Sequence, residues 1–194
     1  MAKNLLQNSC DLVSVTPVAG TNQLAAPFGL VKLQSQVLIA GTTINFTGLA
    51  NYPYTDYKIK YNTTNATGSP KMYIRVSSNN GASYLATGYG SSFSGLPITG
   101  ITWQALSPSE TIGMLMYYQA FTAGQPMCGQ AELYGINQAG AMPSFHGSGT
   151  YNNSAANVYY CVQYGYQTAA ATYNAFQLIA TGNVTGTFTL YGYS

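Results

Sequence analysis

Charged side chains are scarce in this sequence. Its 194 residues include six Lys or Arg, four Asp or Glu and a single histidine, so that 5% of the chain is charged, against roughly 25% in ordinary globular proteins. Acid–base catalysis and metal binding depend on Asp, Glu, His and Cys. We therefore expect a protein that is not an enzyme and that holds no metal or other cofactor.

Other absences narrow the function further. The net charge of +2 comes without a cluster of Lys and Arg, which excludes the usual footprint of nucleic-acid binding. No segment approaches the roughly 20 apolar residues of a membrane span, and the N-terminus lacks the roughly 7–15 apolar residues of a signal peptide. We expect synthesis in a host cytoplasm and no membrane insertion.

The three cysteines, Cys10, Cys128 and Cys161, are odd in number and lack metal-ligand spacing. This argues against both a disulfide framework and a zinc site. Reduced, buried thiols are the simpler expectation.

Tyrosine and glycine are abundant instead, with 18 and 21 copies among many Thr, Ser and Asn residues. Such a surface meets its partners through rings and amides rather than through charges. Because a neutral surface with exposed strands tends to associate, we expect a stable homo-oligomer or a larger assembly.

Apolar residues alternate with polar ones along most of the chain, and no helical stripe exceeds two turns. Period-two alternation is typical of β-strands that place every second residue on one face. The pattern predicts an all-β protein. The alternating runs are Ile44–Phe46, Tyr57–Tyr61, Met72–Val76, Val158–Tyr164, Phe176–Leu178 and Phe188–Leu190.

Turn signals separate these runs. Asn62–Pro70 reads as a polar loop, Asn79–Gly81 as a hairpin turn and Thr181–Asn183 as the link between the last two strands. Gly48 suits a sharp strand exit with positive φ. About eight to ten short strands with polar outer faces predict an antiparallel β-sandwich, specifically a jelly roll.

The sequence predicts two parts: an N-terminal arm at residues 1–35 and the sandwich at residues 36–194. Pro17, Gly20, Pro27 and Gly29 break short apolar runs in the first part. The alternative is that 28–33 already forms the first strand. Residues 110–121 are apolar on both faces, which predicts a strand that is central or lies against another subunit.

Several of these segments, in this order and spacing, resemble the jelly-roll domains of tailed-bacteriophage fibres and related virion proteins. The chain departs from that pattern at Asn79, where such domains often carry an acidic residue, and residues 110–150 match only in general character. The resemblance covers roughly residues 36–194 and is carried by Ile44–Leu49, Tyr54, Tyr57, Met72–Ser77, Asn79–Tyr84, Phe176–Leu178 and Gly186–Gly192.

This resemblance implies a virion structural protein, commonly trimeric, with an N-terminal segment that holds the particle and a sandwich that faces outward. Its partners would be other copies of itself and other virion proteins. It does not imply catalysis.

Tyrosines are the candidate ligand-binding residues, because ring faces stack on the CH groups of sugars while nearby hydroxyls and amides bind the sugar hydroxyls. The alternative is that these rings fill the core or a subunit interface. The candidates are Tyr84, Tyr89, Tyr151, Tyr159, Tyr164 and Tyr166.

Four of the six basic residues, Lys58, Lys60, Lys71 and Arg75, fall at outward positions of two candidate strands. Together they would form a basic face that attracts phosphate or acidic sugar in a bacterial envelope. The alternative is a solvated face that protects a sheet edge.

Catalytic arrangements find little support. His146 lies in a loop-like stretch between glycines, with no Gly-x-Ser-x-Gly elbow and only two aspartates to complete a triad. Glu110 and Glu132 would form a glycosidase pair only if the fold brought them within roughly 5–10 Å.

The leading hypothesis is therefore a bacteriophage fibre or receptor-binding protein that works by multivalent adhesion, with a host-surface glycan as the candidate ligand. The alternative is a capsid decoration or head-fibre subunit with a purely structural role. A polysaccharide depolymerase is disfavoured by the poverty of acidic residues.

Overall fold

The computed structural model describes residues 29–65, 71–96, 102–105, 113–116, 124–152 and 158–193. These residues form ten β-strands and one short 3-10 helix at Leu49–Asn51, and no helix among them is long and apolar enough to cross a membrane. The strands are β1 (Val31–Phe46), β2 (Asp56–Asn65), β3 (Met72–Ser77), β4 (Tyr89–Leu96), β5 (Thr102–Ala105), β6 (Gly113–Met116), β7 (Pro126–Tyr134), β8 (Ser144–Asn152), β9 (Val158–Gln167) and β10 (Ala175–Tyr193).

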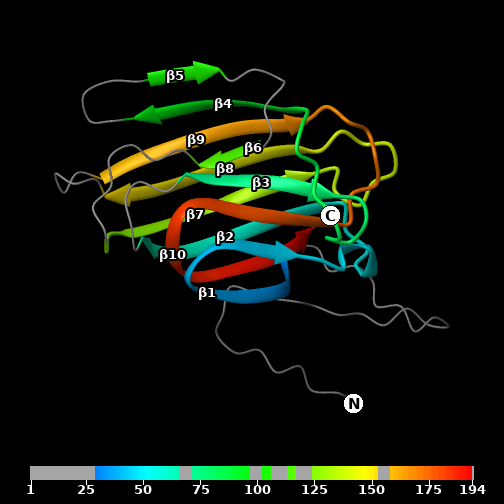
Figure 1. The fold of residues 1–194 in the computed structure, drawn as a ribbon, viewed down its shortest axis with the longest axis horizontal. Coiled ribbons are helices and arrows are strands. Elements are labelled where there is room, and N and C mark those ends of the chain that lie inside the picture. The colour runs from blue at the N-terminus through cyan, green and yellow to red at the C-terminus, as the bar shows by residue number, and fades with distance from the viewer. Residues whose placement is uncertain are drawn as a thin grey trace, which may run out of the picture.

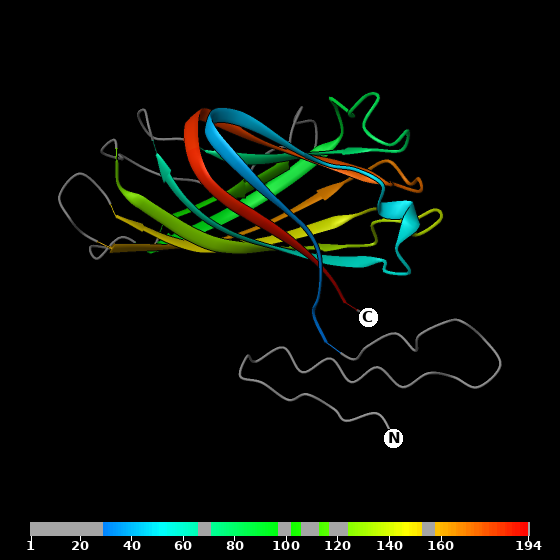
Figure 2. The ribbon, with the colours of Figure 1, turned by 90° about the horizontal axis from the view of Figure 1, so that it is seen from below.

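All strand pairs are antiparallel, and they follow one continuous order, β5-β4-β9-β8-β7-β2-β10-β3-β6, with β1 also paired to β10. The sheet folds over on itself into two layers (Figures 1 and 2). The larger layer holds β5, β4, β9, β8, β7 and β2, and the smaller one holds β3 and β6. The predicted all-β antiparallel sandwich is confirmed, whereas this strand order does not establish jelly-roll connectivity.

Strand β10 connects the layers. Ala175–Ala180 pairs with β3, and Val184–Tyr193 pairs with β2, so one strand serves the smaller layer and then the larger one. Strand β1 follows β10 along both halves, with register shifts around Gly41 and a positive φ of 47° at Ala40. In Figure 2 these two long strands sweep together from one layer to the other.

The core lies between the layers and follows the alternation of the sequence. Ile44 and Phe46 of β1 are buried, and the Phe46 ring lies 5.0 Å from that of Phe176 on β10. The other residues that the sequence predicts to point inward are also buried. They are Tyr57, Ile59, Tyr61, Met72, Ile74, Val76, Leu178, Phe188 and Leu190.

Strand β9 keeps its predicted alternation, but its apolar face is the outer one. Tyr160 and Tyr164 are exposed, while Cys161, Gln163 and Gly165 point inward. A strand whose interior positions are small or amide side chains leaves its large rings at the surface.

The turn predictions are partly right. Gly48 has a φ of 72°, and Asn80 and Gly81 have φ values of 56° and 87°, as the sequence indicates. The prediction of a hairpin, however, is wrong, because the strands on either side of the turn do not pair with each other. β3 pairs with β10 and β6, while the next strand, β4, pairs with β9 and β5. The turn therefore leads from one layer to the other.

Two boundaries also differ from expectation. Thr181–Asn183 lies inside β10, at the point where its partner changes from β3 to β2, so it links two halves of one strand. Strand β1 begins at Val31, ahead of the expected arm boundary at residue 35. β6, within the apolar segment 110–121, lies at one end of the strand order, so it is not central, and the alternative, that it lies against another subunit, stays a prediction.

Truncation of Phe46 to alanine is expected to lower the free energy of unfolding by about 3–5 kcal/mol, because it empties a fully buried site where β1 and β10 enter the smaller layer. Urea denaturation measures this. Val37→Ala on the same strand is the control, since Val37 is exposed, and it is expected to change stability by less than about 0.5 kcal/mol. Equal effects of the two substitutions would contradict the placement of Phe46 in the core.

Candidate binding face

Directly opposed residues form one row across the outer face of the larger layer. From β1 to β9 the paired positions are Lys32, Tyr191, Lys58, Glu132, His146 and Tyr164. Each of these residues alternates with inward-pointing neighbours, so antiparallel register alone brings six side chains from distant parts of the chain into line.

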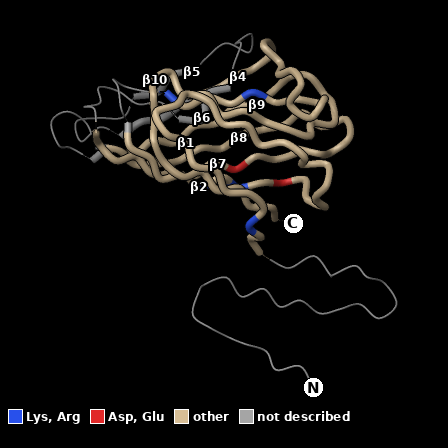
Figure 3. The backbone as a smooth tube through the Cα atoms, turned by 60° about the horizontal axis from the view of Figure 1, so that its bottom comes forward, with Lys and Arg blue, Asp and Glu red and all other residues tan. Residues whose placement is uncertain are grey.

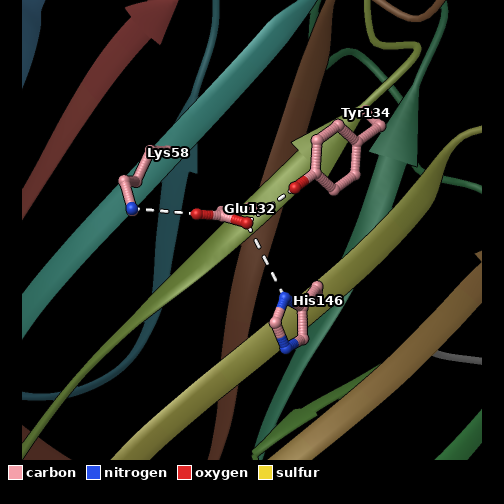
Figure 4. A network of polar contacts seen from close by, with 4 residues as sticks. All are labelled: Lys58, Glu132, Tyr134 and His146. Atoms are coloured by element: carbon pink, nitrogen blue, oxygen red, sulfur yellow. Dashed lines mark hydrogen bonds and ion pairs between the residues drawn. The ribbon is translucent and has the colours of Figure 1, made fainter. Parts of the chain in front are cut away.

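Glu132 is the centre of a polar network within this row (Figure 4). Its Oε1 lies 2.8 Å from Lys58 Nζ, and its Oε2 accepts a hydrogen bond of 2.6 Å from the Tyr134 hydroxyl. His146 Nδ1 lies 3.7 Å from the same Oε2. The carboxylate is thus fixed on two sides by residues of β2 and β7 and approached by β8 on a third.

These contacts shift the pKa values of Glu132 and Tyr134. The hydrogen bonds from Lys58 and Tyr134 hold the pKa of the Glu132 carboxyl below its usual value, despite some desolvation. The hydrogen bond to Glu132 raises the pKa of the Tyr134 hydroxyl in turn. Glu132 is therefore an ionised hydrogen-bond acceptor at neutral pH. A catalytic acid would instead need a raised pKa.

A shallow groove of about 500 Å³ lies beside this network on β7, β8, β9 and β4. Its floor is low because the residue of β8 between Tyr134 and Tyr166 is only a serine, Ser144. Tyr166 leans over Gly90, where a Cβ atom would collide with its ring. Ser92, opposite Tyr164, also lines the groove.

His146 and Tyr164 form the adjoining wall. Their rings are parallel to within 2°, with centroids 4.6 Å apart. Tyr164, Tyr166 and Tyr134 are 53%, 44% and 37% exposed. The groove therefore presents several ring faces and hydroxyls next to one fixed carboxylate, an arrangement suited to a ligand that has both CH surfaces and hydroxyl groups.

The structure divides the six predicted tyrosines. Tyr164 and Tyr166 line the groove. Tyr89 and Tyr151 are buried, at 0% and 5% exposure, so their assignment to a surface site is wrong. The Tyr89 hydroxyl instead accepts from the Val76 backbone N–H within the core.

Tyr84 is half-buried in the turn after β3, and its buried hydroxyl has no hydrogen-bond partner within the part of the chain that the structure describes. It does not line the groove. The side chain of Tyr159 lies outside the described part of the structure.

The predicted basic face does not form. Lys58 and Lys60 lie on β2 in the larger layer, whereas Arg75 lies on β3 in the smaller layer and Lys71 directly precedes that strand. Strands β2 and β3 meet different halves of β10, which places these residues on opposite sides of the sandwich. Figure 3 shows the few charged segments scattered over the chain.

Sequence reasoning missed Tyr134, Ser144 and Ser92 as residues of the site, and it considered Glu132 only as half of a glycosidase pair with Glu110. Glu132 and Tyr134 alternate with the buried Ala131 and Leu133 in β7, so the period-two pattern of this segment was the available signal. His146, expected in a loop, lies in the middle of β8.

The remaining candidates are the acidic pair, a metal site and the cysteines. Glu110 lies outside the described residues, so a Glu110–Glu132 pair is not seen. Within the described residues, no group of three or more His, Cys, Asp or Glu side chains is placed to hold a metal ion. Cys161 is buried as expected, and burial raises its thiol pKa to about 12, but Cys128 is exposed, contrary to expectation.

No protein-family model matches this chain, and no curated protein or solved structure is similar to it. The resemblance to bacteriophage fibre domains therefore stays a prediction. The site has to be interpreted from its own geometry.

Replacement of Lys58 by Gln is expected to raise the pKa of Glu132 toward the ordinary value of 4.5, because the contact with Lys58 contributes most to the lowering. Carbon-detected NMR titration of the carboxyl group measures this, with Lys71→Gln as the control. An unchanged Glu132 pKa in Lys58→Gln would contradict the network.

The same lowered pKa fixes the sign of the pH dependence. The network stabilises the folded protein above pH 4.5, and its contribution is lost as the pH falls through the lower folded-state pKa of Glu132. Glu132→Gln should remove this part of the acid dependence of unfolding.

Proposed function

We propose that this protein is a carbohydrate-binding β-sandwich that acts as an adhesive component of a bacteriophage virion, as a fibre or receptor-binding protein. The observation that carries the binding role is the groove of Tyr134, His146, Tyr164 and Tyr166 beside the ionised Glu132. Sugars present CH surfaces and hydroxyl groups together, and this combination matches ring faces and hydrogen-bonding groups with so little charge.

The chemistry of the groove matches the two sides of a sugar ring. The exposed faces of Tyr164 and Tyr166 supply stacking surface for CH groups, and the serine and tyrosine hydroxyls supply hydrogen bonds. Glu132 is already held by Lys58 and Tyr134, so a sugar hydroxyl would find an acceptor that needs no reorganisation. An open, shallow groove gives weak binding, which several copies on one particle would make effective.

The virion location rests on the resemblance of residues 36–194 to fibre domains and on the scarcity of charge. A neutral, strand-rich surface is well suited to burial in an assembly. We propose that the protein forms a homotrimer and contacts other virion proteins.

Removal of groove rings tests the binding role. Tyr164→Ala and Tyr166→Ala are each expected to weaken binding to the best ligand on a glycan array by about tenfold or more, as expected for exposed anchor rings. Titration calorimetry measures the loss. Tyr160→Ala is the matched control, because Tyr160 is exposed on the same strand but does not line the groove.

Two results would count against this role: the absence of any glycan ligand, or an equal loss in all three variants. An equal loss in all three variants would mean that exposed rings contribute to binding anywhere on this surface, and that the groove is not a specific site.

A capsid decoration or head-fibre role is the second candidate, and the edge strand β1 favours it. Val37 and Ile39 are 68% and 79% exposed on this strand, and among the described strands β1 pairs only with β10. Exposed β-branched residues on a sheet edge are a typical surface for association.

The double variant Val37→Lys, Ile39→Lys is expected to reduce the oligomer to a smaller species, because charge on an edge strand opposes strand association. Sedimentation velocity measures this, and Thr42→Lys, an exposed position of the same strand, is the control. If the oligomer survives the double variant but not the groove variants, assembly uses the groove instead.

A further inference from the structure

The row that contains Glu132 continues away from the groove to a second group of side chains on β1, β10 and β2. Lys32 opposes Tyr191, and Tyr191 opposes Lys58. Lys60 lies one outward position further along β2, and its Nζ lies 5.4 Å from the centroid of the Tyr191 ring. Lys32, Tyr191 and Lys60 thus share one outer surface, which we call the lysine end.

Charge is unevenly distributed along this row. Lys58 is matched by Glu132 at 2.8 Å, whereas Lys32 and Lys60 have no carboxylate within salt-bridge distance among the described residues. The residues that oppose Lys60 are the uncharged Thr189 and Gln130. Both lysines are exposed, so the lysine end carries positive charge.

Asp56 is the other described acid on this surface. It lies four residues from Lys60 along β2, about 13 Å in an extended strand, and its Oδ1 accepts the Gly135 backbone N–H. Asp56 is the first residue of β2, and this length of strand separates it from Lys60.

Tyr191 fixes the position of the Lys60 ammonium group on this surface. Tyr191 is half-buried in β10, and an ammonium over its ring is attracted to the ring face. The Lys60 side chain is thereby held against the sheet over Tyr191, the residue that Lys32 opposes.

The distance between the lysine end and the groove suits a chain-like ligand. From Tyr191 on β10 to Tyr164 on β9, the row crosses β2, β7 and β8, which makes four interstrand spacings of about 4.8 Å, about 19 Å in all. A single monosaccharide cannot contact both ends, but a linear oligosaccharide of several units can.

We propose that the ligand is an acidic polysaccharide that crosses the strands, with an uncharged sugar ring in the groove and an anionic substituent, a carboxylate or a phosphate, at Lys32 and Lys60. This inference rests on the proposed carbohydrate binding and deepens it. It names the class of polysaccharide and predicts that the affinity depends on salt. Dissolved ions weaken the attraction between exposed charges, and the Debye length is about 10 Å at 0.1 M ionic strength.

Matched polymers test the proposal. Polygalacturonate is compared with its fully methyl-esterified form, and phosphomannan with neutral mannan, by biolayer interferometry at 20 mM and 300 mM NaCl. The first pair isolates a carboxylate source of the anion, and the second pair isolates a phosphate source. Acidic members of at least one pair are expected to bind about tenfold more tightly at low salt, with the difference shrinking at high salt.

The double variant Lys32→Gln, Lys60→Gln should abolish this preference and leave binding of the neutral member unchanged. The control is Lys71→Gln, Arg75→Gln, which makes the same change of charge on the other layer and should keep the preference. Circular dichroism verifies that both variants are folded.

The outcomes separate the two proposals. Equal affinity for acidic and neutral members, or equal loss of preference in both double variants, overturns the acidic ligand and leaves the groove intact. Binding of none of the four polymers, together with an empty glycan array, overturns carbohydrate binding itself and the acidic ligand with it.

Discussion

The structure depends on the hydrogen-bonded pairing of β1 with β10, which is present on both sides of the register shifts around Gly41. β10 gives its first half to the smaller layer and its second half to the larger one, and β1 accompanies it through both. The two layers are therefore one folded sheet, and the core forms where that sheet closes on itself, around Phe46, Phe176 and Phe188. Since backbone pairing holds this fold together, side chains on its outer faces remain available for recognition.

The core side of this fold is largely predictable from sequence, because β-branched and aromatic residues at every second position leave little choice of face. Ile44, Ile59 and Ile74 are examples. Tyrosine weakens the rule, since its ring is apolar and its hydroxyl polar. In β2 the tyrosines at 57 and 61 are buried, whereas in β9 the tyrosines at 160 and 164 are exposed, although both strands alternate in the same way.

Strand partnership was the information that sequence did not contain. Asn80 and Gly81 adopt the left-handed conformations that their identities predict, yet the strands on either side of them lie in different layers. The basic face was predicted wrongly for the same reason, because the sequence does not show which strands are neighbours. Lys58 and Arg75 both point outward, but from opposite layers. Conversely, Glu132, His146 and Tyr164 are 32 positions apart at most and form one row only because β7, β8 and β9 are neighbours.

Scarcity of charge makes this row informative. In a protein with an ordinary number of ionisable residues, a Lys–Glu contact on a sheet surface contributes little and occurs often. Here one of the two acids in the described chain is bound by both a lysine and a tyrosine, beside the groove that has the most exposed rings around it. Random placement of ten charges among 194 residues gives no reason for such a coincidence, whereas a site that must hold one ionised acceptor next to stacking surfaces requires it.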